Sequence, residues 1–244
     1  MKSFEVAWLM ARPVLPVLHG RVRRDLASLV SPVVSGDFSL LDVGGRKSPY
    51  TIGLPVRVTI LDLPRQSELQ ESLNLGVSAE IQRAIGRRRS NVTAVILEDM
   101  THCSLPSESF DGVVSVEVIE HVEDDDAFVS QAARVLRRGG WLYLTTPNGD
   151  YVRNEPPNYN PDHRRHYTRE GLRELLRRHF GRFTVTYGIR TGTARARGLG
   201  SLSPRHPLRA AGAALGNLQS HWESRGLDEV PRRTANLFAV AWKE

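Results

Sequence analysis

The chain has 244 residues, of which 40% are hydrophobic and 25% are charged, and its formal net charge is +6. This length suits one domain with a modest cover of extra elements, and no apolar run reaches the ~18 residues that a membrane span needs. A single cysteine, Cys103, excludes an internal disulfide and any multi-cysteine zinc site. We therefore expect a cytoplasmic protein without a membrane partner.

The basic residues are unevenly divided, with three lysines and thirty arginines. Such a bias is typical of a GC-rich genome as much as of a selected basic surface. The run Arg87-Arg88-Arg89 ends a predicted helix, where cations suit the helix C-terminus. A nucleic-acid-binding face needs basic residues spread along one surface, so we do not favour nucleic acid as the partner.

Residues 1–34 are predicted to form two or three short helices before the first strand. The stretch Phe38-Ser-Leu-Leu-Asp-Val-Gly-Gly45 is typical of a strand that runs into a tight turn. Between this strand and the next, Pro49, Gly53 and Pro55 leave room for little more than one turn of helix. Any ligand at these glycines is therefore expected to meet loop backbone.

The second and third predicted strands also end in acidic residues. Arg57–Asp62 finishes twenty positions after Asp42, and Val92–Leu97 is followed by Glu98-Asp99-Met100. Carboxyl ends of parallel strands bind ligands, and an acid at the second strand tip is well placed to accept hydrogen bonds from a ribose diol. The strand ends together indicate a nucleoside-binding sheet. Each of them taken alone is also consistent with an ordinary turn or a solvated strand end.

The remaining elements follow in a regular order. Asp124 to Asp126 place negative charge at the start of a predicted helix, as capping requires, and Ser78 and Thr168 are predicted N-caps. The predicted helices are 66–75, 79–88, 127–136, 169–180 and 208–218, and the further strands are 113–116, 141–145, 183–187 and 236–242.

Four segments together carry a family resemblance: Leu40-Leu-Asp-Val-Gly-Gly45, Leu105–Val114, Glu117–Val122 and Ala133–Leu142. They resemble class I S-adenosylmethionine-dependent methyltransferases of the small-molecule type that includes ubiquinone-pathway O-methyltransferases. The resemblance implies an α/β fold with a doubly wound, seven-stranded, mostly parallel sheet, whose last strand inserts antiparallel beside the fifth. It also implies a single domain over 1–244, with an N-terminal helical cover (1–34), a cofactor-binding core (38–188), a lid or substrate insert (189–233) and a final strand (236–242).

The resemblance also implies which residues bind the cofactor S-adenosylmethionine. Asp42, Gly44 and Gly45 would lie along its methionine portion, Asp62 would hold the ribose hydroxyls, Asp99 and Met100 would flank the adenine, and Glu117 would sit at the mouth of the fourth strand. The sequence departs from the family pattern at Arg46 and Ser48, where glycines are usual. Whether this loop admits the cofactor in the normal way stays open.

Methyl transfer from a sulfonium is an in-line displacement of an activated group, so positioning can supply most of the acceleration. A base is needed only if the acceptor is protonated. The candidates are His163 and His166, in the segment Asp162–Thr168 that follows the fifth strand. The alternative is that these histidines only shape the loop through hydrogen bonds.

A divalent metal is a further hypothesis, to which we do not commit. Glu117, Glu120 and His121 have the spacing of one helical face, and His163 could complete an oxygen and nitrogen cluster. This arrangement is similar to that of metal-dependent RNA 2′-O-methyltransferases. The same Glu-His pair also orders the loop after the fourth strand in relatives that use no metal.

Three functions remain open at this point. The first is methylation of an oxygen or nitrogen of a small metabolite, in a bacterial biosynthetic pathway. The second is metal-dependent RNA 2′-O-methylation, and the third is a methyltransferase-like protein without methylating function. The sequence leaves open the acceptor, the atom methylated and the oligomeric state.

Overall fold

The computed structural model describes residues 1–31, 37–65, 76–156, 159–191 and 205–244. The strands are β1 (Ser39–Val43), β2 (Arg57–Asp62), β3 (Val92–Leu97), β4 (Phe110–Val116), β5 (Leu136–Pro147), β6 (Arg182–Arg190) and β7 (Thr234–Trp242). They form one sheet in the order β3-β2-β1-β4-β5-β7-β6. β7 pairs antiparallel with β5 and β6, and the other pairs are parallel. The predicted seven-stranded topology is confirmed.

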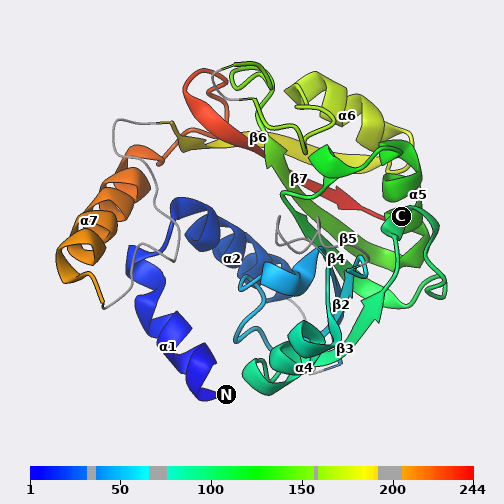
Figure 1. Ribbon diagram of the computed structural model, residues 1–244. Coiled ribbons are helices and arrows are strands. Elements are labelled where there is room, and N and C mark those ends of the chain that lie inside the picture. The colour runs from blue at the N-terminus through cyan, green and yellow to red at the C-terminus, as the bar shows by residue number, and fades with distance from the viewer. Residues whose placement is uncertain (32–36, 66–75, 157–158, 192–204) are drawn as a thin grey trace.

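Helices cover both faces of this sheet (Figure 1). They are α1 (Ser3–Ala11), α2 (Val17–Val30), α4 (Ala79–Arg88), α5 (Asp125–Val135), α6 (Arg169–Arg177) and α7 (Pro207–Glu223), with the short 3-10 turns η1 (Arg12–Val14), η2 (Gly45–Lys47), η3 (Met100–His102) and η4 (Ile119–His121). α5 and α6 pack with one face of the sheet, and α2 and α4 pack with the other.

The alternation of side chains along β1 divides the core. Leu41 and Val43 belong to the hydrophobic cluster under α5 and α6, whereas Leu40 belongs to the cluster under α2 and α4. Successive side chains of a strand point to opposite faces, so Asp42 falls on the side of Leu40. The first strand therefore directs its one carboxylate toward the α2 and α4 layer.

Capping residues fix the ends of three predicted helices. Ser78 accepts a hydrogen bond from the backbone N–H of Ile81, Asp124 accepts one from Ala127, and Thr168 accepts one from Gly171. α4 begins and ends as predicted, and the predicted helix 66–75 lies outside the described residues.

The boundaries around β5 differ from the prediction. The helix before it ends at Val135, and β5 begins at Leu136 instead of Trp141. The residues that were expected to close the helix continue as strand across an irregularity in the pairing of β4 with β5. The backbone N–H of Gly139 donates to the carbonyl of Lys243, 2.7 Å away, which extends the pairing of β5 with β7 past the end of β7.

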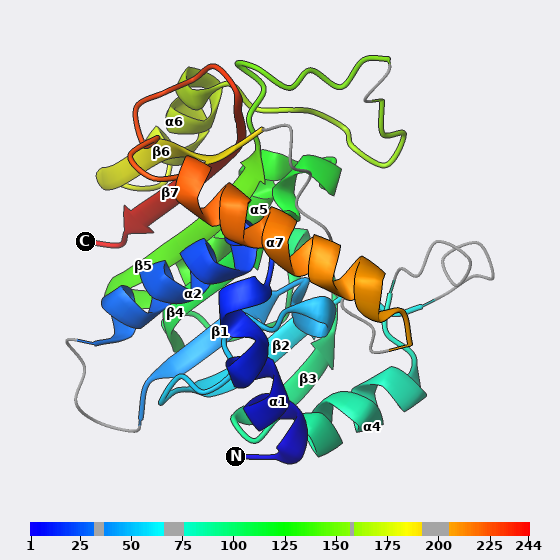
Figure 2. The same cartoon turned by 90° about the vertical axis from the view of Figure 1, so that its left-hand side faces the viewer.

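The N-terminal helices are attached to the sheet through a buried carboxylate. Glu5 of α1 is fully buried and accepts hydrogen bonds from the backbone and hydroxyl of Ser90, two residues before β3. α7 packs on η1 and α2, so α1, α2 and α7 lie together on one side of the molecule (Figure 2). Among the described residues, no helix is long and apolar enough to cross a membrane.

Candidate functional site

A cavity of about 370 Å³ lies at the carboxyl ends of β1, β2 and β3. Its lining comprises Val43, Gly44, Leu61, Asp62, Leu63, Glu98, Asp99, Met100, Thr101, Val118, His121, Val122, Glu123, Asp124 and Phe128. The carboxyl edge of a parallel sheet is where open α/β folds bind ligands. Four residues predicted to bind a cofactor, Gly44, Asp62, Asp99 and Met100, share this cavity.

The turn after β1 depends on a glycine. Gly44 has φ +70°, a left-handed conformation that side chains disfavour, and its N–H donates to the carbonyl of Leu61 at 2.8 Å. A Cβ atom on Gly44 would lie 2.6 Å from Cγ2 of Val118. The turn and the close approach of backbone to the cavity therefore require glycine, and the helix after it is the single turn η2, as predicted.

Backbone donors orient two of the acidic groups that line the cavity, Asp62 and Asp99. The Asp62 carboxylate accepts from the N–H of Arg46 at 3.2 Å and from that of Leu63 at 2.9 Å. Asp99 accepts from the backbone N–H and the hydroxyl of Thr101, each at 2.8 Å. Asp62 thus holds the η2 turn against β2, and Asp99 caps η3, so each carboxylate keeps a fixed position at the cavity wall.

Asp42 lies behind the turn and does not line the cavity. Its side chain is 2% exposed, and its Oδ2 atom has no hydrogen-bond partner among the described residues. Burial raises the pKa of Asp42 to about 6, although the positive charge of Arg89 acts in the opposite direction. A Cβ atom on Gly45 would lie 2.7 Å from Cγ of Asp42, so the carboxylate packs directly under the glycine turn.

Arg89 is a site residue that the sequence did not reveal. It was interpreted as one of three cations that suit a helix C-terminus. The structure shows that it is 5% exposed and that it donates to the carbonyl of Ser48 at 2.8 Å and to the hydroxyl of Thr51. These bonds fix the loop that follows the glycine turn. No sequence signal separates Arg89 from Arg87 and Arg88, because only the packing of the loop over the end of α4 buries it.

Two glutamates lie at the end of β4 in buried surroundings. Glu117 has φ +55° and accepts from the hydroxyl of Thr145 at 2.8 Å, and Glu120 accepts from that of Thr146 at 3.2 Å. Burial raises the pKa of both carboxyls, and the neighbouring charge of Glu117 raises that of Glu120 further. The left-handed conformation of Glu117 means that Glu117, Glu120 and His121 do not share the face of one regular helix.

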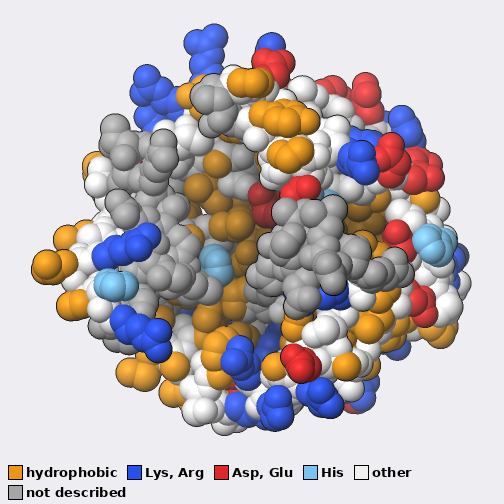
Figure 3. All heavy atoms as spheres, in the orientation of Figure 1, with side chains coloured by type: hydrophobic (Ala, Val, Ile, Leu, Met, Phe, Trp, Pro, Cys, Tyr) orange, Lys and Arg blue, Asp and Glu red, His pale blue; other side chains and the backbone are white. Residues whose placement is uncertain are grey.

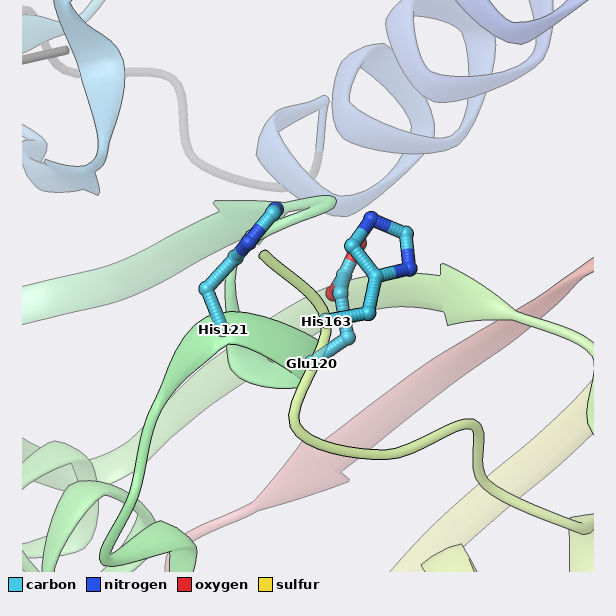
Figure 4. Close-up of side chains that lie close together, drawn as sticks. All are labelled: Glu120, His121 and His163. Carbon is cyan, nitrogen blue, oxygen red and sulfur yellow. The ribbon is translucent and has the colours of Figure 1, made fainter. Parts of the chain in front are cut away.

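Glu120, His121 and His163 nevertheless form a cluster. One ligand atom from each lies within 4.8 Å of those of the other two, and Glu117 is not part of this group. Figure 4 shows that Glu120 and His121 project from η4 and that His163 projects from the loop before α6. The rings of His121 and His163 meet edge to face with centroids 4.7 Å apart. His121 also lines the cavity, so the cluster stands at its rim.

The hydrogen bonds of the histidines define their tautomers. Nδ1 of His166 contacts the carbonyl of Val152 at 2.5 Å, and Nδ1 of His163 contacts Nε2 of His166 at 2.8 Å. A carbonyl can only accept, so we assign the proton to Nδ1 of a neutral His166, whose Nε2 accepts from His163. Nδ1 of His121 likewise donates to the carbonyl of Asp162 at 2.9 Å. Neutral His121 and His163 each keep an Nε2 lone pair for a ligand.

The two predicted catalytic histidines therefore differ in their surroundings. His166 is tied to backbone and to His163, which fits the structural alternative. Burial, followed by repulsion from His121 and His166, lowers the pKa of His163 to about 4. At neutral pH His163 is then an uncharged but weak base, better suited to orienting a hydroxyl or amine than to removing its proton.

Comparisons with known proteins agree with this architecture. Residues 65–144 match a family model described as "Methyltransferase domain". A protein of Mycolicibacterium smegmatis named "Probable S-adenosylmethionine-dependent methyltransferase" is 36% identical over 109 residues, which are 44% of this chain and 41% of that protein. A ubiquinone biosynthesis O-methyltransferase of Rhizobium rhizogenes is 33% identical over 75 residues, covering 31% of this chain and 29% of that protein. The chain thus spans less than half the length of these relatives.

Solved structures share the fold at low identity. A SAM-dependent methyltransferase from Archaeoglobus fulgidus aligns with a TM-score of 0.55 and 14% identity, covering 91% of this chain and 94% of that one. The [4+2]-cyclase SpnF aligns with a TM-score of 0.54 and 20% identity, covering 90% and 80%. The second of these proteins is a cyclase by name, so the fold alone does not decide the reaction. The matched domain, the relatives and the seven-stranded sheet thus make this chain similar to class I S-adenosylmethionine-dependent methyltransferases.

Proposed function

We propose that the chain transfers a methyl group from S-adenosylmethionine to an oxygen or nitrogen atom of a small metabolite. The observation that carries this proposal is the meeting of Gly44, Asp62, Asp99 and Met100 at one cavity where the strands end. The left-handed glycine turn and the two fixed carboxylates suit a nucleoside with a ribose diol and an exocyclic amine.

In this proposal each cavity residue has a distinct role. Asp62 accepts hydrogen bonds from the ribose hydroxyls, and Asp99 accepts one from the adenine amine while Met100 packs against the ring. Gly44 gives the methionine portion room beside the turn. Asp42, Gly45 and Glu117, which do not line the cavity, act from behind it: Asp42 and Gly45 support the turn, and Glu117 supports the end of β4.

Bound S-adenosylmethionine supplies an activated methyl group on a sulfonium, so the protein needs mainly to exclude water and align the acceptor. His163 would orient the acceptor with its Nε2 lone pair, and His166 would hold His163 in that tautomer. Residues 1–34 and 189–233 would form the cover that selects the acceptor, since loops at the binding edge carry specificity.

Binding is tested by calorimetry and thermal shift with S-adenosylmethionine and its demethylated product. A ligand that binds only the native state raises the melting temperature. We expect Asp62→Asn to weaken binding at least about tenfold, because a charge-assisted hydrogen bond contributes ~1.5–3 kcal/mol. Asp37→Asn, at an exposed position just before β1 and so at the opposite end of that strand from the cavity, is the control. An unchanged affinity in Asp62→Asn, or no binding by the wild type, contradicts the proposal.

Transfer itself needs a separate assay. Extracts incubated with the protein and methyl-labelled donor should yield a small molecule heavier by one methyl group. If the cofactor binds and no label is transferred to any metabolite, the third function, a methyltransferase-like protein without methylating activity, is preferred. This outcome is distinguishable from loss of the cofactor site, because binding is measured independently.

The metal-dependent alternative is favoured by one observation, the cluster of Glu120, His121 and His163. A carboxylate and two imidazoles suit a transition metal or zinc, which would lower the pKa of an acceptor hydroxyl such as the 2′-hydroxyl of RNA. Activity that survives exhaustive chelation and Glu120→Gln would eliminate this alternative. Metal-restored activity, lost in both Glu120→Gln and His121→Gln, would support it.

A further inference from the structure

The amphipathic helix α7 has an unusual orientation. Its large apolar side chains face solvent: the exposed fractions are 89% for Leu208, 67% for Leu215, 45% for Leu218 and 70% for Trp222. At roughly 100° per residue these four positions fall within about 80° of arc, so they form one stripe on the helix. We call them the α7 stripe. It runs for about 20 Å, taking 1.5 Å per residue.

The opposite side of α7 attaches the helix to the protein through small and polar residues. Ala213, Asn217 and Ser220 are buried there. The side-chain amide of Asn217 donates to the carbonyl of Val14 at 2.8 Å, and Nε2 of His221 contacts the carbonyl of Leu15 at 2.9 Å. The helix is therefore anchored by specific hydrogen bonds with its polar side inward, and the exposure of the α7 stripe is a consequence of that anchoring.

The neighbouring helix α1 adds to this apolar surface. Met10 is 78% exposed and Val6 is 43% exposed, on the side of α1 away from buried Trp8. α1 and α7 both face the viewer in Figure 2 and lie at the left in Figure 3, where hydrophobic and basic side chains appear side by side. Two adjacent helices thus present exposed apolar groups on one side of the molecule.

The exposed charges on α1 and α7 are mostly basic, although the acidic residues Asp228 and Glu229 follow Arg225 in the loop after α7. The sequence contains no acidic residue between Glu174 and Glu223, and α7 carries the exposed cation Arg209, with Arg225 just beyond its end. In α1 the single acid, Glu5, is fully buried, and exposed Arg12 follows that helix. Among the described residues of the two helices, cations therefore flank the apolar groups without exposed carboxylates between them, apart from half-buried Glu223 at the end of α7.

We propose that α7 and α1 form a peripheral docking surface for an anionic lipid bilayer. A helix that lies in the membrane interface needs an apolar stripe with cations beside it, and a tryptophan suits the headgroup region. The acidic headgroups of such a bilayer complement Arg12, Arg209 and Arg225. A second copy of the chain is a poorer partner, because pairing the same surface with itself would oppose these cations to one another.

This proposal departs from the expectation of no membrane partner. That expectation rested on the length of apolar runs, which tests only for segments that span a bilayer. A helix that lies on the surface buries one stripe while its other side stays on the protein, so it needs no long apolar run. The sequence predicts a helix over 208–218, but it does not show which side of that helix packs on the protein.

Vesicle co-sedimentation of the full chain tests the proposal directly. We expect binding to equimolar phosphatidylglycerol and phosphatidylcholine vesicles, much weaker binding to phosphatidylcholine alone, and a loss as NaCl rises from about 0.05 M to about 0.5 M. Leu215→Gln with Trp222→Gln should lower the partition coefficient at least about tenfold. Arg209→Gln with Arg225→Gln should lower it about fivefold per charge.

The controls match each change at positions away from α1 and α7. Val230→Gln replaces an exposed aliphatic residue, and Arg138→Gln replaces an exposed arginine at the start of β5, and neither should alter vesicle binding. Circular dichroism verifies folding of each variant. Tryptophan emission should shift to the blue on binding. Trp222→Phe should abolish this shift, because Trp8 and Trp141 are already buried and the partly buried Trp242 lies at the end of β7, outside α1 and α7.

Three results would overturn the proposal. One is a wild-type chain that does not sediment with anionic vesicles at low salt. Another is binding that the α7 substitutions leave unchanged. The third is a stable dimer in light scattering that Leu215→Gln with Trp222→Gln dissociates, which would assign the α7 stripe to self-association.

Discussion

The carboxyl group of Asp42 is expected to make the protein less stable as pH rises. Burial raises the pKa of Asp42 from 3.8 to about 6, so the folded state holds this proton more tightly than the unfolded chain does. The stabilisation that comes with the proton is complete below the unfolded pKa and is lost as pH rises through the folded one. Asp42→Asn keeps the shape of the side chain and removes the titration.

The size of the effect follows from the shift. Each pKa unit corresponds to 1.36 kcal/mol, so a shift of about two units gives about 3 kcal/mol, of which about 2 kcal/mol falls between pH 4 and pH 7. We therefore expect the free energy of unfolding of Asp42→Asn, minus that of the wild type, to grow by about 2 kcal/mol over this range. Differences that do not depend on pH, such as altered packing under the glycine turn, cancel from this change.

Urea denaturation at several pH values, followed by tryptophan fluorescence, measures the difference. Asp37→Asn reports the effect of removing an exposed carboxylate under the same conditions. A difference for Asp42→Asn that stays constant, or that falls with rising pH, would mean that Arg89 stabilises the charged carboxylate more than burial destabilises it. The assignment of a raised pKa to Asp42 would then be wrong.

Three further predictions concern stability at neutral pH. Gly44→Ala should destabilise the fold by at least ~1–2 kcal/mol and abolish cofactor binding in calorimetry, because the left-handed turn and a neighbouring side chain exclude a Cβ. An unchanged midpoint in urea would contradict this strain. Thr168→Ala should cost about 1 kcal/mol through loss of the α6 N-cap, with Thr168→Ser close to wild type. Tyr143→Phe should cost ~1–2 kcal/mol because Asp25 loses a hydrogen bond at 3.0 Å, whereas Tyr151→Phe at an exposed position should change stability by less than ~0.5 kcal/mol.

Local chemistry was enough to predict much of the fold. Helix caps such as Ser78 and Thr168 act within one turn, so the residues that carry the signal are close in sequence to the ends they define. Strand ends at Asp62 and before Asp99 were equally visible, because alternation and terminal acids are local patterns. The glycine at position 44 was informative for the same reason, since the turn that it permits is made by its own backbone.

Contacts between distant segments were invisible to these patterns. Whether a strand-end carboxylate reaches the cavity depends on the sheet face to which its side chain points. The alternation along β1, in register with its neighbouring strands, directs Asp42 away from the cavity. The burial of Arg89 and the inward polar side of α7 were likewise decided by elements far apart in the chain. Composition and residue spacing thus determined the helices and strands and their order along the chain. Only the tertiary structure decided which faces of these elements pack together, because the burial of a side chain depends on the distant segment that packs against it.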